Sequence, residues 1–339
     1  MKLIQNKRNG QFFYDAGVDM AMQDYLIHQL DQEENIIFPY LSEPKVQIGR
    51  YQNTKKEVDL SYARIHDIKI SRRDTGGGAL YIDEGSPAFC YIFTDRSLYM
   101  DYERLYEPVI AVLKELGVET VRMAGRNDLE VDGYKISGAA MRMVNNKVHA
   151  GYSILIDVDY ETLGRVLTPD NQKISSKGID SIRKRVRGIR EFLTPEYQSL
   201  SSQEIVDLIT CRILGIDRIE NATVHELSEK DWQKIDRACQ DKYQNWTWNY
   251  GQDPHYEQVI SHKFSGGFLE VHLNITRGQI QAIKLFGDFF GSADIKDVEE
   301  RLVGQPLIKE KLLDALADLP ITNYLGLITA EELVALIVE

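Results

Sequence analysis

Hydrophobic and polar positions change their period at short intervals along this chain, from the helical repeat to the strand repeat and back. Residues 15–30 carry apolar side chains near helical spacing, and Asp15 stands where it can cap the first turn. Strand patterns follow at 36–40 and 45–48, and a second helix is predicted over 57–66. This alternation indicates an α+β fold.

Two short hairpins are the clearest structural signal in the middle of the chain. Asp132-Gly133 joins two strand-like runs and supplies the residues that a primed two-residue turn needs. Asn145-Asn146 predicts a second turn, so the strands beside both turns should be antiparallel neighbours. Strict alternation along the shared strand would place Lys135 and Ser137 on one face, opposite Ile136.

The rest of the pattern completes two domains. Further strands are predicted at 68–71, 88–94, 118–123, 264–275 and 279–285, and further helices at 101–116, 160–167, 203–214, 228–243, 295–302, 309–316 and 330–338. A run rich in Gly, Pro and aromatic residues at 245–254 places the boundary between a domain at 1–247 and one at 252–339. The polar, aperiodic run at 168–178 predicts a mobile surface loop.

Length and composition set the outer limits. A chain of 339 residues exceeds what one hydrophobic core usually supports, and 43% hydrophobic residues is ordinary for a soluble protein. No apolar run has the length of a membrane span, and the first residues lack the apolar core of a signal peptide, so a cytoplasmic location is predicted. The net charge of -12 argues against broad nucleic-acid binding.

Three cysteines and one basic run are also informative. Cys90, Cys211 and Cys239 have no metal-ligand spacing and are odd in number, so we expect buried thiols rather than a zinc site or disulfides. The run 183–190 concentrates positive charge in an acidic chain. Such a run is typical of a solvated face, and a contact with a nucleotide or an acidic partner is an equally good interpretation.

The glycine-rich stretch at 72–81 is the main candidate for an anion site. Three consecutive glycines after two arginines can turn several backbone N–H groups into one concavity, and guanidinium groups add a fork of donors. A hairpin turn with basic flanks is the simpler alternative. The stretch lacks the Lys-Ser/Thr ending of a Walker phosphate loop, and it does not open a helix as a dinucleotide motif does.

A second candidate is the run of small residues that follows Lys135. A lone lysine on a strand is usually a solvated surface charge. Small residues beside it let a ligand approach the strand closely, however, and a nearby acid such as Asp128 can hold Mg²⁺ against a phosphate. His149 fits either a general base or a packing residue with satisfied hydrogen bonds, and the packing interpretation is favoured.

With these segments in place, the chain resembles the lipoate-protein ligases, which are related to biotin ligases and class II tRNA synthetases. The resemblance covers nearly the whole chain and is carried by residues 72–81, Asn127-Asp128-Leu129, 135–140, Ser175-Ser176-Lys177-Gly178 leading to Arg185-Val186, 264–267 and 284–290. It implies a class II tRNA-synthetase/biotin-ligase-like catalytic domain, with mixed, largely antiparallel sheets flanked by helices, plus a small α+β C-terminal domain.

The resemblance also implies an activity. The family activates lipoate with ATP to lipoyl-AMP, releasing pyrophosphate. It then transfers the lipoyl group to a lysine of a lipoyl-acceptor domain, on 2-oxoacid dehydrogenase E2 subunits or the glycine cleavage H protein. ATP, Mg²⁺ and lipoate are therefore the expected small molecules.

Site residues follow from the same resemblance. It assigns Lys135 as the catalytic residue, in contact with both nucleotide and lipoate, and Asp128 to Mg²⁺. The nucleotide would also contact Arg73, Gly78, Ala79, Leu80, Tyr81 and Asn127, and lipoate would also contact Arg72, Gly76, Gly77, Gly138, Ala139 and His149.

Some alternatives stay open. The family often has His, Asn and Thr where this chain has Ile82, Ser86 and Tyr152, so the sequence does not fix the preference between lipoate and octanoate. One rival activity is an ATP-independent octanoyl or lipoyl transferase of the same fold, and some of those enzymes use an activated cysteine. Neither Cys90, in an apolar strand, nor Cys211, in a predicted helix, is expected to be activated. The other rival is a carrier-binding protein without catalysis.

Overall fold

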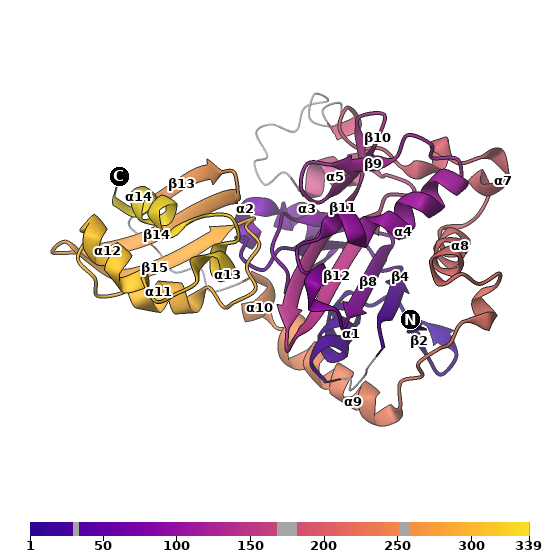
Figure 1. The fold of residues 1–339 in the computed structure, drawn as a ribbon, viewed down its shortest axis with the longest axis horizontal. Coiled ribbons are helices and arrows are strands. Elements are labelled where there is room, and N and C mark those ends of the chain that lie inside the picture. Colours follow the sequence, from indigo (N-terminus) through magenta and orange to yellow (C-terminus); the bar gives the residue numbers. More distant parts are fainter. Residues whose placement is uncertain (30–33, 168–181, 251–257, 339) are drawn as a thin grey trace. The chain divides into compact units, whose positions relative to one another are not determined.

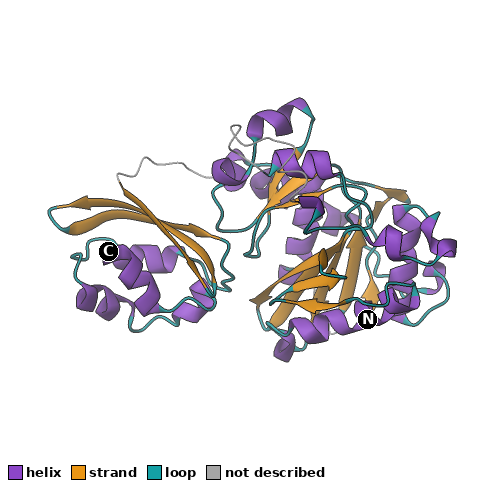
Figure 2. Cartoon of the chain, turned by 90° about the horizontal axis from the view of Figure 1, so that it is seen from above, coloured by secondary structure: helices purple, strands orange, loops and turns teal. Residues whose placement is uncertain are grey.

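The computed structural model describes residues 1–29, 34–167, 182–250 and 258–338. Contacts divide the chain into two compact units, drawn in Figures 1 and 2. The first unit contains Met1–Gln47, Lys55–Arg72 and Leu80–Asn249, and the second contains Ile48–Thr54, Arg73–Ala79 and Tyr250–Glu339. Contacts therefore group the glycine-rich loop with the C-terminal part of the chain, whereas the sequence-based division leaves it within 1–247. The predicted loop at 168–178 and part of the predicted boundary at 245–254 lie outside the described residues.

A seven-stranded sheet forms the centre of the first unit. Its strand order is β1-β4-β8-β12-β11-β10-β9, and neighbours are antiparallel except for the parallel pair β1 and β4. The strands are β1 (Lys2–Leu3), β4 (Ile36–Tyr40), β8 (Ala88–Phe93), β9 (Arg122–Ala124), β10 (Asp128–Val131), β11 (Tyr134–Val144) and β12 (Lys147–Ile154). This mixed, mainly antiparallel sheet agrees with the expected fold class. The strand predicted over 118–123 is wrong for most of its length, because Val118 and Val121 are buried in an irregular segment before β9.

Both predicted two-residue turns are confirmed. Asp132 (φ 50°) and Gly133 (φ 83°) link β10 to β11, and Asn145 (φ 50°) and Asn146 (φ 62°) link β11 to β12. Positive φ at both central positions is what a type I′ turn requires, and Asn, Asp and Gly tolerate it best. The second turn fixes the register of β11 and β12, in which Arg142 stands opposite His149.

Strict alternation fails at the start of β11. The register of β10 and β11 shifts between Leu129 and Glu130, as it does at a β-bulge. The Ser137 hydroxyl oxygen lies 3.1 Å from that of Tyr106, and Ile136 belongs to the same buried cluster as Tyr106. The prediction that Ser137 faces away from Ile136 is therefore wrong, because both contact one core.

Helices cover both faces of the seven-stranded sheet. On one face, α4 (Tyr102–Glu115) and α8 (Ser202–Leu214) pack into a core with β11 and β12. On the other, α1 (Ala16–His28) and α9 (Glu229–Ala238) share a cluster with Phe38 and Cys90. The predicted cap of α1 is confirmed, since the Asp15 carboxylate accepts hydrogen bonds from the N–H groups of Gly17 and Val18.

A three-stranded sheet in the first unit contains the other strands that carry predicted site residues. Its order is β6-β5-β7, from β5 (Lys45–Ile48), β6 (Lys69–Arg72) and β7 (Leu80–Ile82). The single helix predicted over 57–66 is wrong, because α2 (Thr54–Glu57) ends and α3 (Leu60–Ile65) restarts behind a new cap, Asp59, whose carboxylate accepts from the Tyr62 N–H. The other described elements of this unit are β2 (Lys7–Arg8), β3 (Gln11–Phe12), α5 (Tyr160–Val166), α7 (Pro195–Gln198), a π-helix at Cys239–Tyr243 and α10 (Trp246–Tyr250), with 3₁₀ helices at Arg96–Leu98, Ile189–Phe192 and Ile219–Asn221.

The second unit is a small α+β domain. Its sheet has the order β13-β14-β15, from β13 (Gln258–Phe264), β14 (Gly267–Thr276) and β15 (Gln279–Gly287). Its helices are α11 (Lys296–Leu302), α12 (Lys309–Leu316), α13 (Ile321–Leu325) and α14 (Ala330–Val338), which bury one face of the sheet. The strand predicted over 264–275 is wrong at its start, where the chain turns at 265–266, and the sequence does not predict α13. Within the described parts of the chain, no helix is both long and apolar enough to span a bilayer.

Candidate active site

Lys135, on β11, and Asp128, at the start of β10, form an ion pair between these two neighbouring strands. The Lys135 Nζ atom lies 2.9 Å from Asp128 Oδ1, and the two side chains are 41% and 34% exposed. An ion pair with this exposure contributes little to stability, about 0–1 kcal/mol. Both groups therefore remain reachable by a ligand, and the amine can exchange one anionic partner for another at small cost.

The backbone of Lys135 is fixed from its second side by the chain at 185–187. The Lys135 N–H donates to the Arg185 carbonyl at 2.7 Å, and the Lys135 carbonyl accepts from the Arg187 N–H at 3.1 Å. Val186 forms an isolated parallel bridge with Lys135. With β10 on its other edge, this segment has a rigid backbone, so only the lysine side chain needs to move.

Because Gly138 has no side chain, the Lys135 amine can occupy the space beside it. A Cβ built at Gly138 would lie 3.3 Å from Lys135 Nζ and 3.4 Å from Asp128 Oδ1. Ala139 differs, because its methyl group is buried on the opposite face, in register with Tyr152. The amide of Asn127 donates to the Ala139 carbonyl, and the Ala139 N–H donates back to the Asn127 carbonyl at 2.8 Å. Asn127 thus holds the strand that carries Gly138.

A row of small residues leads away from the amine along the α1 face of the sheet. The register sets Gly138 beside Ser153 and Ala88, and Ala140 beside Gly151 and Cys90. A strand rises about 3.4 Å per residue, so the Cys90 level lies about 7 Å from Gly138 and the Arg142–His149 level about 14 Å from it. One row of small residues therefore runs between Lys135 and His149, and it is here called the lane. Its members are Gly138, Ser153, Ala88, Ala140, Gly151 and Cys90.

The far end of this lane holds a buried Cys-His-Arg cluster. His149 Nε2 lies 3.2 Å from Cys90 Sγ, and Arg142 Nε donates to His149 Nδ1 at 3.3 Å. Because a guanidinium always donates, Nδ1 must accept, so the neutral ring carries its proton on Nε2 and directs it at the sulfur. Burial raises the pKa of the Cys90 thiol. Sequence patterns alone do not predict this contact, although the Asn145-Asn146 turn already pairs Arg142 with His149.

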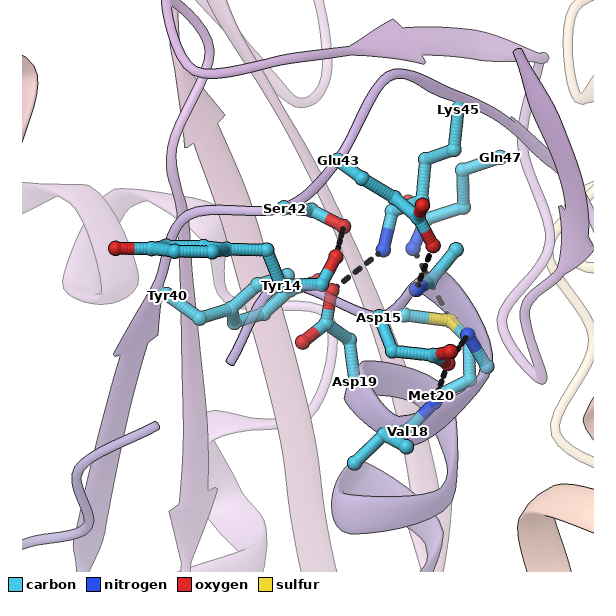
Figure 3. Close-up of polar contacts among 12 residues, drawn as sticks. Tyr14, Asp15, Val18, Asp19, Met20, Tyr40, Ser42, Glu43, Lys45 and Gln47 are labelled. Atoms are coloured by element: carbon cyan, nitrogen blue, oxygen red, sulfur yellow. Dashed lines mark hydrogen bonds and ion pairs between the residues drawn. The ribbon is translucent and has the colours of Figure 1, made fainter. Parts of the chain in front are cut away.

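A second buried polar pair, drawn in Figure 3, lies between α1 and β5. Lys45 Nζ is 3.0 Å from Asp19 Oδ2, and neither side chain has any solvent exposure. Burial raises the pKa of the Asp19 carboxyl, and the charge of Lys45 acts in the opposite direction. The ammonium also lies 5.3 Å from the centre of the Tyr40 ring. The strand pattern at 45–48 does not reveal that its lysine is buried, so the sequence misses this pair.

In the second unit, Arg73 braces the glycine-rich loop from within. Its Nε donates to Thr75 Oγ1 at 3.0 Å, and one terminal nitrogen donates at 2.8 Å to each of the Gly76 and Gly78 carbonyls. The side chain is buried along with most of the loop. Arg73 therefore shapes the loop backbone directly, in addition to any part it takes in binding.

Gly76, Gly77 and Gly78 differ in backbone conformation and in the space around them. Gly77 alone among them adopts positive φ, at 95°. A Cβ at Gly76 would overlap the Phe289 carbonyl oxygen, whereas no described atom lies within 4 Å of a Cβ built at Gly78, which is exposed. Only the second glycine therefore needs the left-handed region, whereas the first serves close packing and the third borders open space.

Of the remaining predicted residues, Arg72, Leu80 and Tyr81 lie on β6 and β7 of the first unit. The Arg72 guanidinium donates to the Trp248 carbonyl at 2.8 Å and to the Asn249 carbonyl at 3.2 Å, which ties it to α10. Leu80 and Tyr81 pair with Gln47 and Val46 of β5. Burial and the neighbouring Asp83 raise the pKa of the Tyr81 hydroxyl. Ala79 is half-buried at the end of the loop in the second unit.

The structure thus brings part of the predicted set together. Lys135, Asp128 and Gly138 lie together, and Asn127 is hydrogen-bonded to the backbone of Ala139 beside them. His149 stands at the other end of the lane, and the Ala139 side chain lies on the opposite face. Among the described residues, no group of three or more His, Cys, Asp or Glu side chains could hold a metal ion by itself. A Mg²⁺ site at Asp128 would therefore need substrate phosphates as further ligands, which is the usual arrangement for this ion.

Comparisons with known proteins cover both parts of the chain. Residues 15–214 match the family described as lipoyl protein ligase A/B catalytic domain, and residues 253–337 match the family described as bacterial lipoate protein ligase C-terminus. The chain is 46% identical to a lipoate-protein ligase of Streptococcus pyogenes over 98% of both chains. It is 44% identical to lipoate-protein ligase 2 of Staphylococcus aureus over 100% of both.

Solved structures agree on the fold. Plasmodium falciparum LipL1, solved in complex with lipoate, has a TM-score of 0.75 and 19% identity, covering 99% of this chain and 98% of that one. A lipoate-protein ligase A solved with bound ATP has a TM-score of 0.58 and 22% identity, covering 74% of this chain and 98% of that one. At these identities the likeness establishes the fold and leaves the chemistry to the site residues.

Proposed function

The chain belongs to the lipoate-protein ligase family of amide-bond-forming ligases, and we propose that it activates lipoate with ATP and transfers the lipoyl group to an acceptor lysine. The observation that carries the proposal is the Lys135–Asp128 pair at the head of a lane of small residues. An amine that is half exposed, rigidly based and paired with one carboxylate is suited to meet two incoming anions.

In the first step, a lipoate carboxylate oxygen attacks the α-phosphorus of ATP. An oxygen–phosphorus bond forms, the bond to the β-phosphate oxygen breaks, and pyrophosphate leaves with its electron pair. The two reactants are both anions, so they repel each other as they approach. A fixed ammonium at Lys135 offsets this repulsion and stabilises the charge that develops on the phosphorus oxygens.

In the second step, the neutral amine of the acceptor lysine attacks the lipoyl carbonyl. The amide bond forms, AMP leaves, and the amine loses a proton. Lys135 again lies where negative charge develops, on the carbonyl oxygen. E2 subunits of 2-oxoacid dehydrogenases and the glycine cleavage H protein are the acceptors we propose. A bipartite lipoate-protein ligase of related fold from Thermoplasma acidophilum belongs to an archaeal lipoylation system that includes its E2 lipoyl domain.

On the nucleotide side, we assign the glycine-rich loop and the strand that follows it. Gly78 borders open space where backbone N–H groups can meet phosphate oxygens, and Arg73 holds that backbone in shape. The proposed contacts are Arg73, Gly78, Ala79, Leu80, Tyr81, Asn127 and Lys135. Asn127 acts in this assignment mainly through the strand that it holds.

Asp128 is the proposed Mg²⁺ ligand. Its carboxylate is exposed enough to take a second cation, and one or two carboxylates plus substrate phosphates suffice for this ion. The ion would neutralise phosphate charge during the displacement. Asp128→Asn should therefore raise the Mg²⁺ concentration needed for half-maximal activity, with Glu130→Gln on the same strand as control.

On the acid side, we assign lipoate to the lane that starts at Lys135. Its carboxylate would meet the amine, and its chain would pass Gly138 towards His149. Arg72, Gly76 and Gly77 are proposed to shape this site, and Ala139 contributes backbone rather than its methyl group. An eight-carbon acid with a terminal ring is close in length to the distance of about 7 to 14 Å from Gly138 to the Cys90 and His149 levels.

Exchange of labelled pyrophosphate into ATP tests the first step without an acceptor. The wild-type chain should exchange label only when lipoate is present. Lys135→Ala should lower the exchange rate by about 10²–10³, the loss expected for a group that stabilises transition-state charge. Normal exchange by Lys135→Ala would refute the assigned role, and lipoate-independent exchange would refute the reaction.

An ATP-independent acyl transferase is the second candidate, because Cys90 lies beside His149. The geometry disfavours it. His149 Nδ1 already accepts from Arg142, so Nε2 holds a proton and cannot take one from the thiol, and burial raises the Cys90 pKa further. Transfer from an octanoylated carrier in the absence of ATP would favour this candidate over the ligase.

A further inference from the structure

We infer that Gly151 and Cys90 select the acid, because Gly151 leaves width for a small ring and Cys90 ends the space beyond it. The inference rests on the proposed function and deepens it, since it names the residues that fix the length and the end group of the substrate. The acid that fits is an eight-carbon chain whose last carbons belong to a five-membered ring. Lipoate meets this description, whereas octanoate has the length without the ring.

Solvent reaches the lane although it lies on inner strands. β8, β12 and β11 stand third to fifth in the seven-stranded sheet, and α1 packs against β8 and β12 on this face. All lane residues except Cys90 are nonetheless half-buried. The residues that alternate with them along the same strands are buried in the core of the opposite face, namely Phe89, Ala139, Met141, Ala150 and Tyr152. Exposure that follows the strand period in this way indicates a space between the sheet and α1.

The far end of this space is closed by buried side chains. Cys90, His149 and Arg142 are 2%, 5% and 8% exposed. His149 Nε2 lies 3.2 Å from Cys90 Sγ, so the imidazole occupies the space between the Cys90 level and its own. Arg142 is anchored behind it, because one of its terminal nitrogens lies 3.5 Å from Asp24 Oδ1 on α1. The same carboxylate oxygen lies 3.5 Å from Lys242 Nζ, which ties the wall to the π-helix. An acid longer than the lane would have to break these contacts.

Gly151 widens the lane at the level of Cys90. It stands between Ala140 and Cys90 in the register of the three strands. Its φ does not lie in the left-handed region, so the backbone conformation does not demand glycine. A Cβ built at Gly151 would lie 3.3 Å from the Phe89 carbonyl oxygen and 3.8 Å from Cys90 Cα, which a shift of a few tenths of an ångström accommodates. The missing side chain therefore leaves room that the fold does not need and a ligand can use.

An eight-carbon acid brings its ring to this level. Such a chain spans about 9 Å when extended, and the Cys90 level lies about 7 Å along the strand from Gly138. With the carboxylate at the Lys135 amine, which lies beside Gly138, the ring carbons fall between Gly151 and Cys90. A ring sulfur can there accept the His149 Nε2–H that points at the thiol, and its polarisable contact with Cys90 adds to the interaction. The methyl end of octanoate cannot accept that hydrogen bond.

Acid-dependent pyrophosphate exchange, measured with lipoate, octanoate and hexanoate, tests the assignment. In the wild type we expect kcat/KM to be about tenfold higher for lipoate than for octanoate, since a group that fits or misfits a pocket changes this ratio by about 10–200-fold. Gly151→Ala puts a methyl group into the space of the ring. The value for lipoate should then fall about tenfold and that for octanoate by less than about threefold, with the KM for ATP unchanged.

Cys90→Leu tests the length of the lane. The larger side chain should lower kcat/KM at least about tenfold for lipoate and octanoate, whereas hexanoate ends before it and should keep the wild-type value. A retained hexanoate rate also shows that the variant is folded. Val144→Ala is the matched control, because Val144 lies beyond Arg142 on the same strand and packs against the same cluster as Cys90. This control should leave the ratios between the acids unchanged.

Calorimetric titration with the same acids, in the absence of ATP, supplies a second measurement. The dissociation constants should change in the same order as kcat/KM. The inference is overturned by equal losses for all three acids, by unchanged values in both lane variants, or by octanoate that binds the wild type as tightly as lipoate does. A wild-type chain that binds lipoate with the expected preference and yet shows no lipoate-dependent exchange would instead refute the proposed function.

Discussion

Asp19 and Lys45 form a fully buried ion pair, with Lys45 Nζ 3.0 Å from Asp19 Oδ2 and no exposure of either side chain. The pair joins α1 to β5 and so connects the helix that covers the lane to the smaller sheet (Figure 3). Asp19 Oδ1 has no hydrogen-bond partner among the described residues. The interaction therefore compensates the burial of two charges only in part.

Breaking this pair should destabilise the first unit more than removing it altogether. Lys45→Met leaves a buried carboxylate unpaired and should cost about 3–5 kcal/mol of unfolding free energy. The double variant Lys45→Met with Asp19→Asn should recover most of that loss, because no buried charge remains. Chemical unfolding of the full chain measures both. Additive losses in the double variant would contradict this account of the pair.

The glycine-rich loop offers a matched pair of substitutions. Gly76→Ala would drive a methyl group into the Phe289 carbonyl, so it should lower the unfolding free energy of the second unit by about 1–3 kcal/mol. Gly78→Ala adds its methyl group to open space and should leave stability within about 0.5 kcal/mol of wild type. If Gly78 borders the nucleotide, that variant should still raise the KM for ATP about tenfold in the exchange assay. An unchanged KM would remove Gly78 from the nucleotide site.

Cys90→Ala tests whether the thiol takes part in chemistry. We expect exchange and transfer rates within about threefold of wild type, because a protonated thiol beside a donating His149 Nε2–H is not a nucleophile. Loss of the sulfur should cost about 1–2 kcal/mol of stability through the small cavity that remains. Normal exchange combined with abolished transfer would instead identify an acyl-cysteine intermediate.

Local sequence signals predict the turns and strands near the site. The other contacts of the site depend on pairing between strands that are far apart in the chain, which these signals do not reveal. The turns at Asp132-Gly133 and Asn145-Asn146 need only two adjacent residues of the right type, so they and the antiparallel strands follow from the sequence. Cys90 meets His149 only because β8 pairs with β12, across 59 positions of the chain. No local period carries that information.

The pattern of hydrophobic and polar residues also does not show that a charged side chain is buried. Lys45 stands in a strand where alternation would send it to solvent, yet Asp19 on α1 holds it inside. The resemblance names Lys135 and Asp128, but the register shift at Leu129 and Glu130 decides how their strands meet. Beside this register shift the Ser137 hydroxyl meets that of Tyr106, a contact across 31 positions of the chain that the local sequence does not describe.

The pH dependence of the second unit should depend on Glu299. Its carboxylate accepts from Lys284 Nζ at 2.8 Å and from the Leu285 N–H at 2.9 Å, at the edge of β15. Burial raises the pKa of this carboxyl above its ordinary value of 4.5, and the charge of Lys284 opposes the shift. The folded chain therefore binds this proton more tightly than the unfolded chain does.

The sign of the effect follows from that inequality. The contribution of Glu299 to stability is fully present below pH 4.5, and it is lost as the pH rises through the raised pKa of the folded state. Glu299→Gln cannot titrate, so its stability relative to wild type should improve as the pH rises from about 4.5 into the neutral range. Thermal unfolding of the full chain at a series of pH values measures the difference, with the exposed neighbour Glu300→Gln as control. A constant offset between Glu299→Gln and wild type at every pH would mean that the ion pair with Lys284 balances the effect of burial, and a relative stability that falls as the pH rises would mean that the ion pair outweighs it.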